Sequence, residues 1–553
     1  MTGGFAAPAE GTGVSRRAFL SGAGALSVGV GAVALSACSP SQPSDNTTAP
    51  TAQASPSDYK AKPDPIPEDQ IAETLEADVV VVGAGVAGSN AALMAAKSGA
   101  RVIVLQKEAG VIANGAGFGA YGTQMQKDTG QEWDVEEEIN RWMRESEYRS
   151  DRKLVHLWAQ FSAIAVDQLV ELCKDDEECQ PILYDPAWQV VYPDPWNFAY
   201  SGGVVFLGPG GMVRVCEVVL ENAQANGAEV YYSTPAKQLL QDDSGKVTGV
   251  IAQREDGSYI RVNAKNGVVL AAGDYGNNPD FRSEYMPHIE GLESAYMVKS
   301  NQGDGHLMGL WAGAQMQKGP HAGNIHYDPA LPPAPSVAGS GCPWLWVNLL
   351  GERFCNEDCS YGQIYAQAMN QPEFMHYQVF DDNFAADVEA GRMGEGNNKN
   401  GPFPGFGMAF IQPQIESGDV LTADTIEELA EKMEVPADAL VATVARYNEL
   451  YDLGLDEDFG KQAGRLTAIR QAPFHAILRK PSLLCSLGGL VINEKMEVVD
   501  DQGVAIPGLW AAGNNSGNWF GGLEHPMVIP GMSLGRAAVT GYLAGLSAAG
   551  QTY

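Results

Sequence analysis

The stretch 77–108, ADVVVVGAGVAGSNAALMAAKSGARVIVLQKE, constrains the fold of this chain more than any other part. The β-branched run at 79–82 is apolar on both faces, which is typical of a strand buried inside a parallel sheet. Three glycines in GxGxxG spacing follow, and the sequence then predicts a helix over 91–97 and a second strand over 101–105. Strand, glycine turn, helix and strand in this order predict a dinucleotide-binding unit.

Each glycine of this turn has its own physical task. Gly83 permits the tight turn, Gly85 lets the backbone approach a pyrophosphate, and Gly88 lets the helix pack on the strand. The start of the helix presents N–H groups to the phosphate charge. We therefore expect the dinucleotide to contact Gly83, Gly85, Val86, Ala87 and Gly88.

The end of the second predicted strand carries a neutral residue, Gln106. In dinucleotide-binding units an acid usually stands here and binds the ribose hydroxyls. The amide oxygen of Gln106 can still accept one hydroxyl proton, but without charge. The neutral residue also removes the clearest sequence sign that separates one bound dinucleotide from another.

Several later stretches occur in the order seen in one flavoprotein family. They are NGAGFGAYG (114–122), STPAKQLL, VVLAAGDYGNN, NQGDGHLMGLWAGAQM, VNLLGERFCNE, ARYNELYDLGLDEDFGK, and GLWAAGN with IPGMSLGRAAVTGYLAG. Through them the chain resembles, over most of 76–549, the group that contains the fumarate reductase flavoprotein subunit, L-aspartate oxidase and 3-ketosteroid Δ1-dehydrogenase.

This resemblance implies that the dinucleotide is FAD. The stretch 114–122 has no histidine, the residue that holds the flavin covalently in some relatives, so we expect noncovalent FAD. N–H groups at the start of the last helix would stabilise a reduced, anionic flavin, although simple packing of this helix is equally compatible with its small residues. Beyond the first turn, the resemblance places the cofactor against Gln106, Lys107, Asn114, Gly115, Ala116, Gly117, Ala236, Ala272, Gly273, Asp304, Gly513, Asn514, Gly531, Ser533 and Leu534.

The order of the motifs implies an α/β architecture. We expect a Rossmann-like, GR2-type FAD-binding domain formed by 70–318 and 478–553, with an α+β capping domain inserted at 319–477. The substrate would lie between the cap and the flavin, where closure excludes water.

The proton-transfer region differs from that of the fumarate reductases. After RFCNE, Tyr361 stands where the resemblance places their proton-delivering arginine. Leu484 and Cys485 stand where relatives have histidines, and Val528 stands in place of a second arginine. A buried dicarboxylate would be poorly compensated without these donors, so fumarate and succinate are disfavoured as substrates.

A tyrosine after the same motif is similar to the ketosteroid dehydrogenases. We expect Tyr361 to donate a proton to the substrate α-carbon, or to remove one, while flavin N5 carries hydride at the β-carbon. A packing role for this tyrosine is the alternative, and Tyr365 is the rival proton donor. Tyr192 and His525 are candidates for binding a substrate carbonyl.

Aromatic residues are frequent in the Pro-rich loop 184–206, in CPWLWV and in NWFGGLEH, which suits a flat and largely neutral substrate. We therefore predict reduction of a carbonyl-activated C=C bond of a bulky, weakly charged organic molecule. The alternatives are 3-ketosteroid Δ1-dehydrogenase-type oxidation and a non-catalytic flavin electron carrier. The sequence has no covalent haem motif, so we expect electrons to come from a separate membrane or haem-containing partner.

The N-terminus predicts export. SRRAFL (15–20) is a twin-arginine pattern, an apolar run follows over 23–35, and LSAC (35–38) resembles a lipobox. We expect a signal peptide at 1–37, a lipid anchor on Cys38 and a disordered linker over 38–69, rich in Ser, Pro and Thr. The protein would then sit on the outer face of the bacterial cytoplasmic membrane.

The formal net charge of −33 disfavours nucleic acid as a partner, because phosphates would be repelled. The eight cysteines include no CxxC spacing, and we predict no metal site. A disulfide between Cys173 and Cys179 or between Cys355 and Cys359, ligands to an iron–sulfur cluster, and unpaired thiols all remain open.

Overall fold

The computed structural model describes 59–115, 117–130, 133–183, 203–292, 298–326, 342, 344–358, 366–389, 411–521, 528–529 and 531–553. Residues 58–553 cluster as one unit, and Met1–Ser57 as another. The predicted export signal and Cys38 lie outside the described residues.

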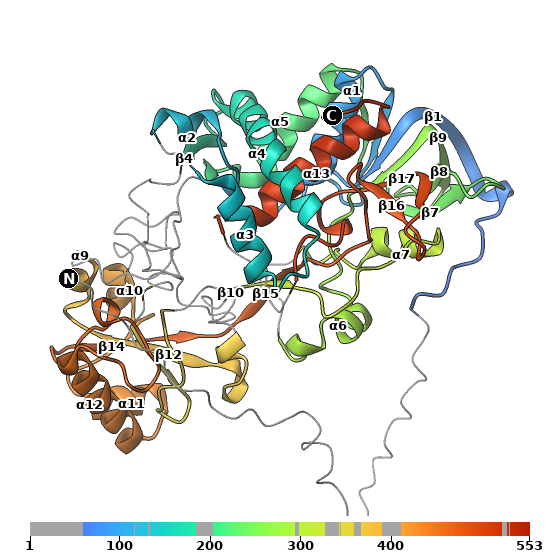
Figure 1. Cartoon of the computed structure of the whole chain (residues 1–553). Coiled ribbons are helices and arrows are strands. Elements are labelled where there is room, and N and C mark those ends of the chain that lie inside the picture. The colour runs from blue at the N-terminus through green and yellow to red at the C-terminus, as the bar shows by residue number, and fades with distance from the viewer. Residues whose placement is uncertain are drawn as a thin grey trace, which may run out of the picture. The chain divides into compact units, whose positions relative to one another are not determined.

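A sheet of eight strands carries the glycine turn (Figure 1). The strand order is β16-β17-β9-β1-β2-β6, and β7 joins through β8 to β9. At its centre β1 runs parallel to both β2 and β9, as the βαβ prediction requires, so the predicted α/β fold class is confirmed. The strands are β1 (Ile71–Val82), β2 (Val102–Leu105), β6 (Glu229–Tyr231), β7 (Ala236–Gln241), β8 (Val247–Gln253), β9 (Tyr259–Leu270), β16 (Glu497–Val499) and β17 (Ala505–Ala511).

Two elements begin earlier than the sequence predicts. The helix α1 (Val86–Lys97) starts directly after Gly85, five residues before the predicted start at 91. Its first turn contains Gly88 and Ser89, which have weak intrinsic helix propensity, but burial against the sheet outweighs that preference. β1 starts at Ile71 rather than at 79, because its polar first half pairs with the long strand β9.

Four helices form a group beside the main sheet: α1, α13 (Met532–Ala548), α4 (Arg152–Cys173) and α5 (Gly211–Ala225) (Figure 1). α1 and α13 pack very closely. A Cβ on Gly541 would lie 2.2 Å from the carbonyl oxygen of Ala87, and one on Gly545 would lie 2.3 Å from that of Ala91. Small residues in the last helix therefore allow contact between two helix backbones.

A second, antiparallel sheet of order β11-β12-β14-β13 lies within the segment predicted as the cap. Two helices, α11 (Ile426–Met433) and α12 (Ala437–Leu453), share an apolar core with it. The strand β14 continues to Arg479, two residues past the predicted cap limit at 477. The other predicted domain limits stay predictions. The strands are β11 (Leu345–Asn348), β12 (His376–Asp381), β13 (Leu421–Ala423) and β14 (Phe474–Arg479).

Two small sheets complete the strands. β3 (Gly117–Phe118), β5 (Val204–Leu207) and β4 (Gln180–Leu183) form one, and β10 (Gly323–His326) with β15 (Ser482–Ser486) forms the other. The other α-helices within the described ranges are α2 (Gln124–Asp128), α3 (Val135–Glu145), α6 (Pro279–Tyr285), α7 (Asp304–Trp311), α9 (Phe384–Glu389) and α10 (Ile411–Ser417). Single 3-10 turns are η1 (Glu68–Gln70), η3 (Pro287–Ile289), η4 (Pro372–Phe374), η6 (Ala463–Arg465) and η7 (Gly513–Asn515).

The prediction of a disordered linker up to residue 69 is wrong for 59–69. The carbonyl oxygen of Lys60 accepts from Nε1 of Trp311 at 2.9 Å. The N–H of Ile66 donates to Oε1 of Gln238 at 3.1 Å. A Pro- and Asp-rich composition suggested disorder, but these tertiary hydrogen bonds hold the segment against α7 and β7.

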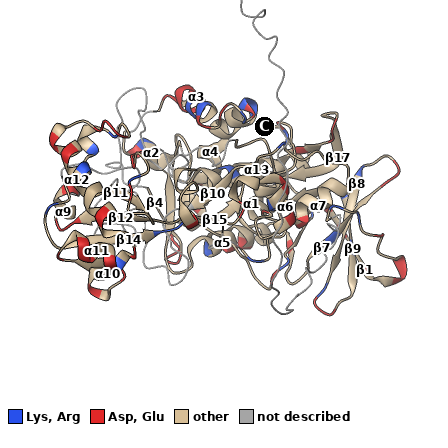
Figure 2. Ribbon diagram, turned by 90° about the horizontal axis from the view of Figure 1, so that it is seen from below, with Lys and Arg blue, Asp and Glu red and all other residues tan. Residues whose placement is uncertain are grey.

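Acidic residues lie on the helices α10, α11 and α12 and at loop tips next to the main sheet (Figure 2). This distribution agrees with the net charge of −33. No helix within the described ranges is long and apolar enough to cross a membrane.

Candidate functional site

The three glycines of the turn after β1 have different surroundings. Gly83 and Gly88 are required by the close packing of the backbone, whereas Gly85 borders open space. A Cβ on Gly83, whose φ is +105°, would stand 2.3 Å from the carbonyl oxygen of Ala271. A Cβ on Gly88 would stand 1.9 Å from the carbonyl oxygen of Gly83. At Gly85 the φ of −74° suits any residue, and the nearest atom would be 3.6 Å away. The open space at Gly85 fits the predicted approach of a pyrophosphate.

Two helices begin without a side-chain cap, α1 at this turn and α13 after Gly531. Gly85 is the N-cap of α1, whose first residues Val86 and Ala87 are buried. Gly531 is the N-cap of α13 and has a φ of +77°. N–H groups at a buried helix start need a partner, and the helix dipole favours an anion. The two helix starts therefore fit the negatively charged parts of a flavin dinucleotide.

Two glycine-rich stretches meet at the start of α13. A Cβ on Gly531 would lie 2.4 Å from the carbonyl oxygen of Gly117, and one on Gly115 would lie 2.7 Å from Cδ1 of Leu534. The backbone contact excludes a larger residue at Gly531, and the φ of +83° disfavours one at Gly115. The predicted cofactor residues in these two segments are Asn114, Gly115, Gly117, Gly531, Ser533 and Leu534, and Ala116 lies outside the described residues.

Gln106 is buried at the end of β2 and braces the nucleotide turn. Its Oε1 accepts from the N–H of Ala84 at 3.3 Å, and its Nε2 donates to the carbonyl oxygen of Gly110 at 2.8 Å. Its own carbonyl oxygen accepts from the N–H of Thr234 at 2.8 Å, two residues before Ala236. An amide oxygen has two lone pairs, so one is left for the predicted ribose hydroxyl.

Lys107 and Asp304 were predicted separately as cofactor residues, and the structure joins them. Lys107 Nζ lies 2.8 Å from Oδ2 of Asp304, across 197 residues of sequence. Lys107 also donates to the carbonyl oxygen of Ser300 at 2.9 Å. Both charged side chains are partly exposed, so the pair adds little to stability. It mainly holds the start of α7 beside the segment that follows β2.

A buried network that the sequence analysis missed connects three turns. Asn515 Oδ1 accepts from the N–H of Ala272 at 2.6 Å, and its Nδ2 donates to the carbonyl oxygen of Gly273 at 3.1 Å. Nδ2 also lies 3.1 Å from Nδ1 of His306, and Nε2 of that ring lies 3.0 Å from the carbonyl oxygen of Asn514. Burial lowers the pKa of His306 to about 4, so the neutral ring accepts at Nδ1 and donates at Nε2. Its position directly after the Gly-Asp-Gly stretch was the available signal.

A second buried network lies directly after Gly273 in the chain. The hydroxyl of Tyr275 lies 2.6 Å from Nδ1 of His321, whose Nε2 donates to the carbonyl oxygen of Gln317 at 2.8 Å. Asp274 accepts from the N–H of Ser486 at 3.3 Å, and burial raises the pKa of Asp274. The bond between Ser486 and Asp274 joins the turn that contains Gly273 to β15, the strand that carries Cys485.

The four predicted catalytic residues, Tyr361, Tyr365, Tyr192 and His525, lie outside the described residues, so their roles stay predictions. The motif that precedes Tyr361 is described and forms a buried ion cluster. Arg353 lies 2.8 Å from both Glu357 and Asp456.

Lys461 completes this cluster, with Nζ 3.3 Å from Oε2 of Glu357 and 2.7 Å from the hydroxyl of Tyr447. The four charged side chains are at most 6% exposed, and their two positive and two negative charges balance. The cluster therefore fixes Arg353 and Glu357, which precede Tyr361 in the chain.

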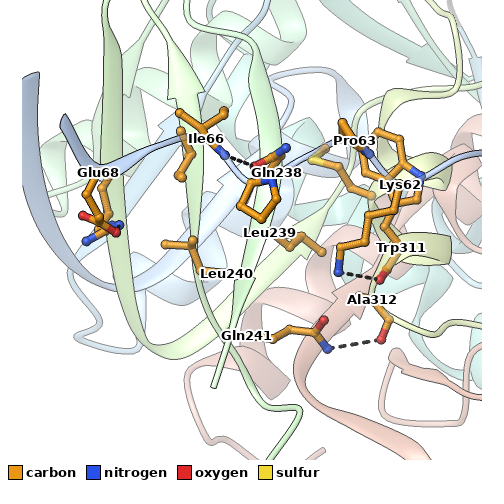
Figure 3. A pocket seen from close by; sticks show the side chains of 14 residues that line it. Lys62, Pro63, Ile66, Glu68, Gln238, Leu239, Leu240, Gln241, Trp311 and Ala312 are labelled. Atoms are coloured by element: carbon orange, nitrogen blue, oxygen red, sulfur yellow. Dashed lines mark hydrogen bonds and ion pairs between the residues drawn. The ribbon is translucent and has the colours of Figure 1, made fainter. Parts of the chain in front are cut away.

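Figure 3 shows a pocket away from these networks, lined by the segment 62–68, by β7 and by the end of α7. Its polar groups bind one another. Lys62 Nζ donates to the carbonyl oxygen of Trp311 at 3.2 Å, and Gln241 Nε2 donates to that of Ala312 at 3.2 Å. None of the predicted cofactor residues that the structure describes lines this pocket, and its satisfied polar groups do not mark it as the reaction site.

The described cysteines form no disulfide with one another, and Cys173 and Cys179 are neighbouring buried thiols. Across the residues that the structure describes, no group of three or more His, Cys, Asp or Glu is placed to hold a metal ion. Cys359 lies outside that part of the chain.

Comparison with known proteins agrees with this geometry. The family profile of the FAD binding domain matches residues 78–525. The chain is 29% identical over 505 residues to vinyl phenol reductase from Lactiplantibacillus plantarum, covering 86% of this chain and 97% of that protein. The profile and the flavoprotein neighbours confirm FAD as the cofactor.

Two solved structures have the same fold at 26% identity. One is the open conformation of a flavocytochrome c3 fumarate reductase, with a TM-score of 0.65, covering 87% of this chain and 79% of that one. The other is 3-ketosteroid-Δ4-(5α)-dehydrogenase from Rhodococcus jostii RHA1 with 4-androstene-3,17-dione, with a TM-score of 0.66, covering 86% and 97%.

Proposed function

This chain belongs to the FAD-binding domain family and is an FAD-dependent oxidoreductase that acts on carbon–carbon bonds. We propose that it works as a reductase. The substrate would be a bulky, weakly charged organic molecule with a carbonyl-activated C=C bond. The observation that carries the reductive direction and the low substrate charge is the match to a vinyl phenol reductase over 97% of that protein, because its named substrate is an uncharged aromatic alkene.

The residues at the three altered positions support a weakly charged substrate. Val528 is completely buried, and Cys485 lies in β15 with part of its surface exposed. Neither side chain can donate a charge-assisted hydrogen bond to a carboxylate. A dicarboxylate at these positions would lose its water without gaining compensating partners.

FAD, when bound, supplies transfer of a hydride to or from the substrate carbon. Tyr361 would hold the proton for the neighbouring carbon, because a phenol with an ordinary pKa of about 10 can donate to a carbanion-like centre. The buried cluster around Arg353 supports this role, since its member Glu357 lies four residues before Tyr361 in the chain.

A second candidate is reduction of an alkene conjugated to a hydroxylated aromatic ring, which the vinyl phenol reductase match favours. Oxidation of a saturated ketosteroid is a third, favoured by the ketosteroid dehydrogenase structure. The test is an anaerobic titration of the holoenzyme, followed at the flavin absorption band. Reoxidation of reduced enzyme by cyclic enones, but not by 4-vinylphenol or fumarate, is the expected result.

The other outcomes of that titration are equally informative. Reoxidation by 4-vinylphenol alone would support the aromatic alkene. Bleaching of the oxidised enzyme by a saturated 3-ketosteroid would support the oxidation instead. Rapid reoxidation by fumarate would contradict the proposal of a weakly charged substrate.

We further propose that the protein is exported, anchored through Cys38, and supplied with electrons by a separate membrane or haem-containing partner. The order of twin arginines, apolar run and lipobox supports this. Replacing Arg16 and Arg17 with Lys should keep the protein inside the cell, and Cys38→Ala should release it from the membrane fraction. Acid precipitation should release all FAD, since 114–122 has no histidine to bind it covalently.

A further inference from the structure

Arg536 is a buried cation in the second turn of α13. Its side chain has no exposed surface. Nη1 donates to the carbonyl oxygen of Gly513, and Nη2 donates to Oδ1 of Asn514 at 2.5 Å. The guanidinium carbon lies 5.2 Å from the centre of the Phe520 ring, and Nε has no hydrogen-bond partner among the described residues.

The positive charge of Arg536 is not balanced by the described part of the chain. Its partners there are neutral oxygens, and no described carboxylate forms an ion pair with it. Burial lowers the pKa of Arg536 to about 10, and the neighbouring Cys485 opposes this effect. Two other buried arginines differ, since Arg353 and Arg141 each contact two carboxylates.

A buried cation without an anion is strongly unfavourable, so an anion from outside the polypeptide is expected beside it. FAD carries negative charge on its pyrophosphate, and its ring gains one negative charge on reduction by two electrons and one proton. The start of α1 is the expected pyrophosphate site. Arg536 belongs to α13 and lies beside Phe520 and Cys485, and its acceptor Gly513 also packs against Ala87 at the start of α1, so the test below must separate the flavin ring from the pyrophosphate.

We propose that Arg536 neutralises the negative charge that the isoalloxazine ring acquires on reduction, and thereby raises the midpoint potential of the bound FAD. The N–H groups at the start of α13 act in the same direction, because the positive end of the helix dipole lies there. The electrons come from the partner that the oxidoreductase requires, and the proton comes from solvent.

The test compares Arg536→Met, which removes the charge, with Arg536→Lys, which keeps it. The midpoint potential of the holoenzyme is measured anaerobically against a reference dye. Arg536→Met should weaken binding of reduced relative to oxidised FAD by about tenfold. For a two-electron couple this corresponds to a potential lower by about 30 mV. Arg536→Lys should recover most of the shift, and Arg470→Gln, which removes an exposed arginine of the cap, should cause none.

Affinity for oxidised FAD, measured by fluorescence titration of the apoprotein, separates the alternatives. We expect it to change little in Arg536→Met. A large loss of affinity with an unchanged potential would assign Arg536 to the pyrophosphate and overturn the proposal. An unchanged affinity together with an unchanged potential would also overturn it.

The stability of the apoprotein provides a measurement that does not depend on activity. If the charge is uncompensated without FAD, Arg536→Met should melt no lower than the wild-type apoprotein. If Arg536→Met does not bind FAD, Arg536→Gln, which keeps a donor for Asn514, is used for the potential. A lower apoprotein melting temperature in both neutral variants would show a structural role and contradict the proposal.

Discussion

At the scale of single residues, Gly85 and Gly88 stand in one turn for different physical reasons. A Cβ at Gly88 would collide with the backbone, whereas a Cβ at Gly85 would meet no protein atom closer than 3.6 Å. Gly85, which the dinucleotide is expected to approach, is therefore dispensable for the fold, whereas Gly88 is not.

This difference predicts opposite outcomes for two similar variants. Gly85→Ala should leave the melting temperature of the apoprotein unchanged and lower FAD affinity by about tenfold or more, because the methyl group occupies ligand space. Gly88→Ala should destabilise the apoprotein itself by about 1–3 kcal/mol through overpacking. Melting curves and fluorescence titration measure the two effects. Normal FAD binding by Gly85→Ala would refute this assignment of the pyrophosphate site.

Tyr361 gives a second prediction at this scale. Tyr361→Phe should lower turnover by about 10²- to 10⁴-fold, because it removes the proposed proton donor, while FAD stays bound. Tyr365→Phe, four residues later in the chain, is the matched control and should keep most activity. Stopped-flow kinetics with the substrate found in the titration would measure both, and full activity in Tyr361→Phe would exclude its role.

At the scale of elements, the cap depends on the buried ion cluster that joins the Arg353 turn to α12 and the loop after it. Arg353 lies between the rings of Tyr447 and Phe459, 5.0 and 4.9 Å from their centres. Both of its carboxylate partners are completely buried. Removing the arginine would leave buried Asp456 without its ion pair and Glu357 with Lys461 as its remaining cation in the cluster.

Arg353→Leu should therefore lower the free energy of unfolding by roughly 3–5 kcal/mol. Arg446, on α12, is the matched control because it also pairs with acids but is 40% exposed. Arg446→Leu should change stability by less than about 1 kcal/mol. Urea unfolding monitored by tryptophan fluorescence would compare the two, and equal losses would mean that burial does not set the strength of the cluster.

At the scale of the whole molecule, buried histidines should make stability depend on pH. Burial lowers the pKa of His306 and of His321 to about 4 and that of His376 to about 3, from an ordinary 6.5. Below pH 6.5 the unfolded chain binds protons that the folded chain does not. Stability is then complete above pH 6.5 and falls as the pH is lowered toward 4, and the raised pKa of Asp274 opposes this loss only in part.

We expect each of these rings to contribute up to about 1.4 kcal/mol per pH unit in this window. His376 stacks on Trp346 at 4.3 Å, and neither of its ring nitrogens has a partner among the described residues, so His376→Phe should fit and flatten the slope. His156→Gln, at a position 47% exposed, should leave it unchanged. Urea midpoints between pH 7.5 and 5 would measure this, and a slope that His376→Phe does not alter would contradict it.

Local sequence was sufficient for the strand–turn–helix–strand unit at the centre of the sheet, and the resemblance of the later motifs was sufficient for the cofactor. The valine run and the glycine spacing predicted β1, its turn and α1, because strand burial and positive φ angles leave a local pattern. The start of α1 and the folded segment 59–69 were not predicted, since their stability comes from contacts with the sheet and α7 rather than from propensity.

The sequence by itself determined that a strand, a glycine turn and a helix would present backbone N–H groups to a dinucleotide, because that requirement acts over a few neighbouring residues. Only the tertiary structure decided which distant groups complete the site. His306 meets Asn515 across 209 residues, and Arg536 is buried against Gly513 and Asn514 without a carboxylate partner among the described residues. Such pairings depend on how the sheet brings its loops together, and no local pattern records them.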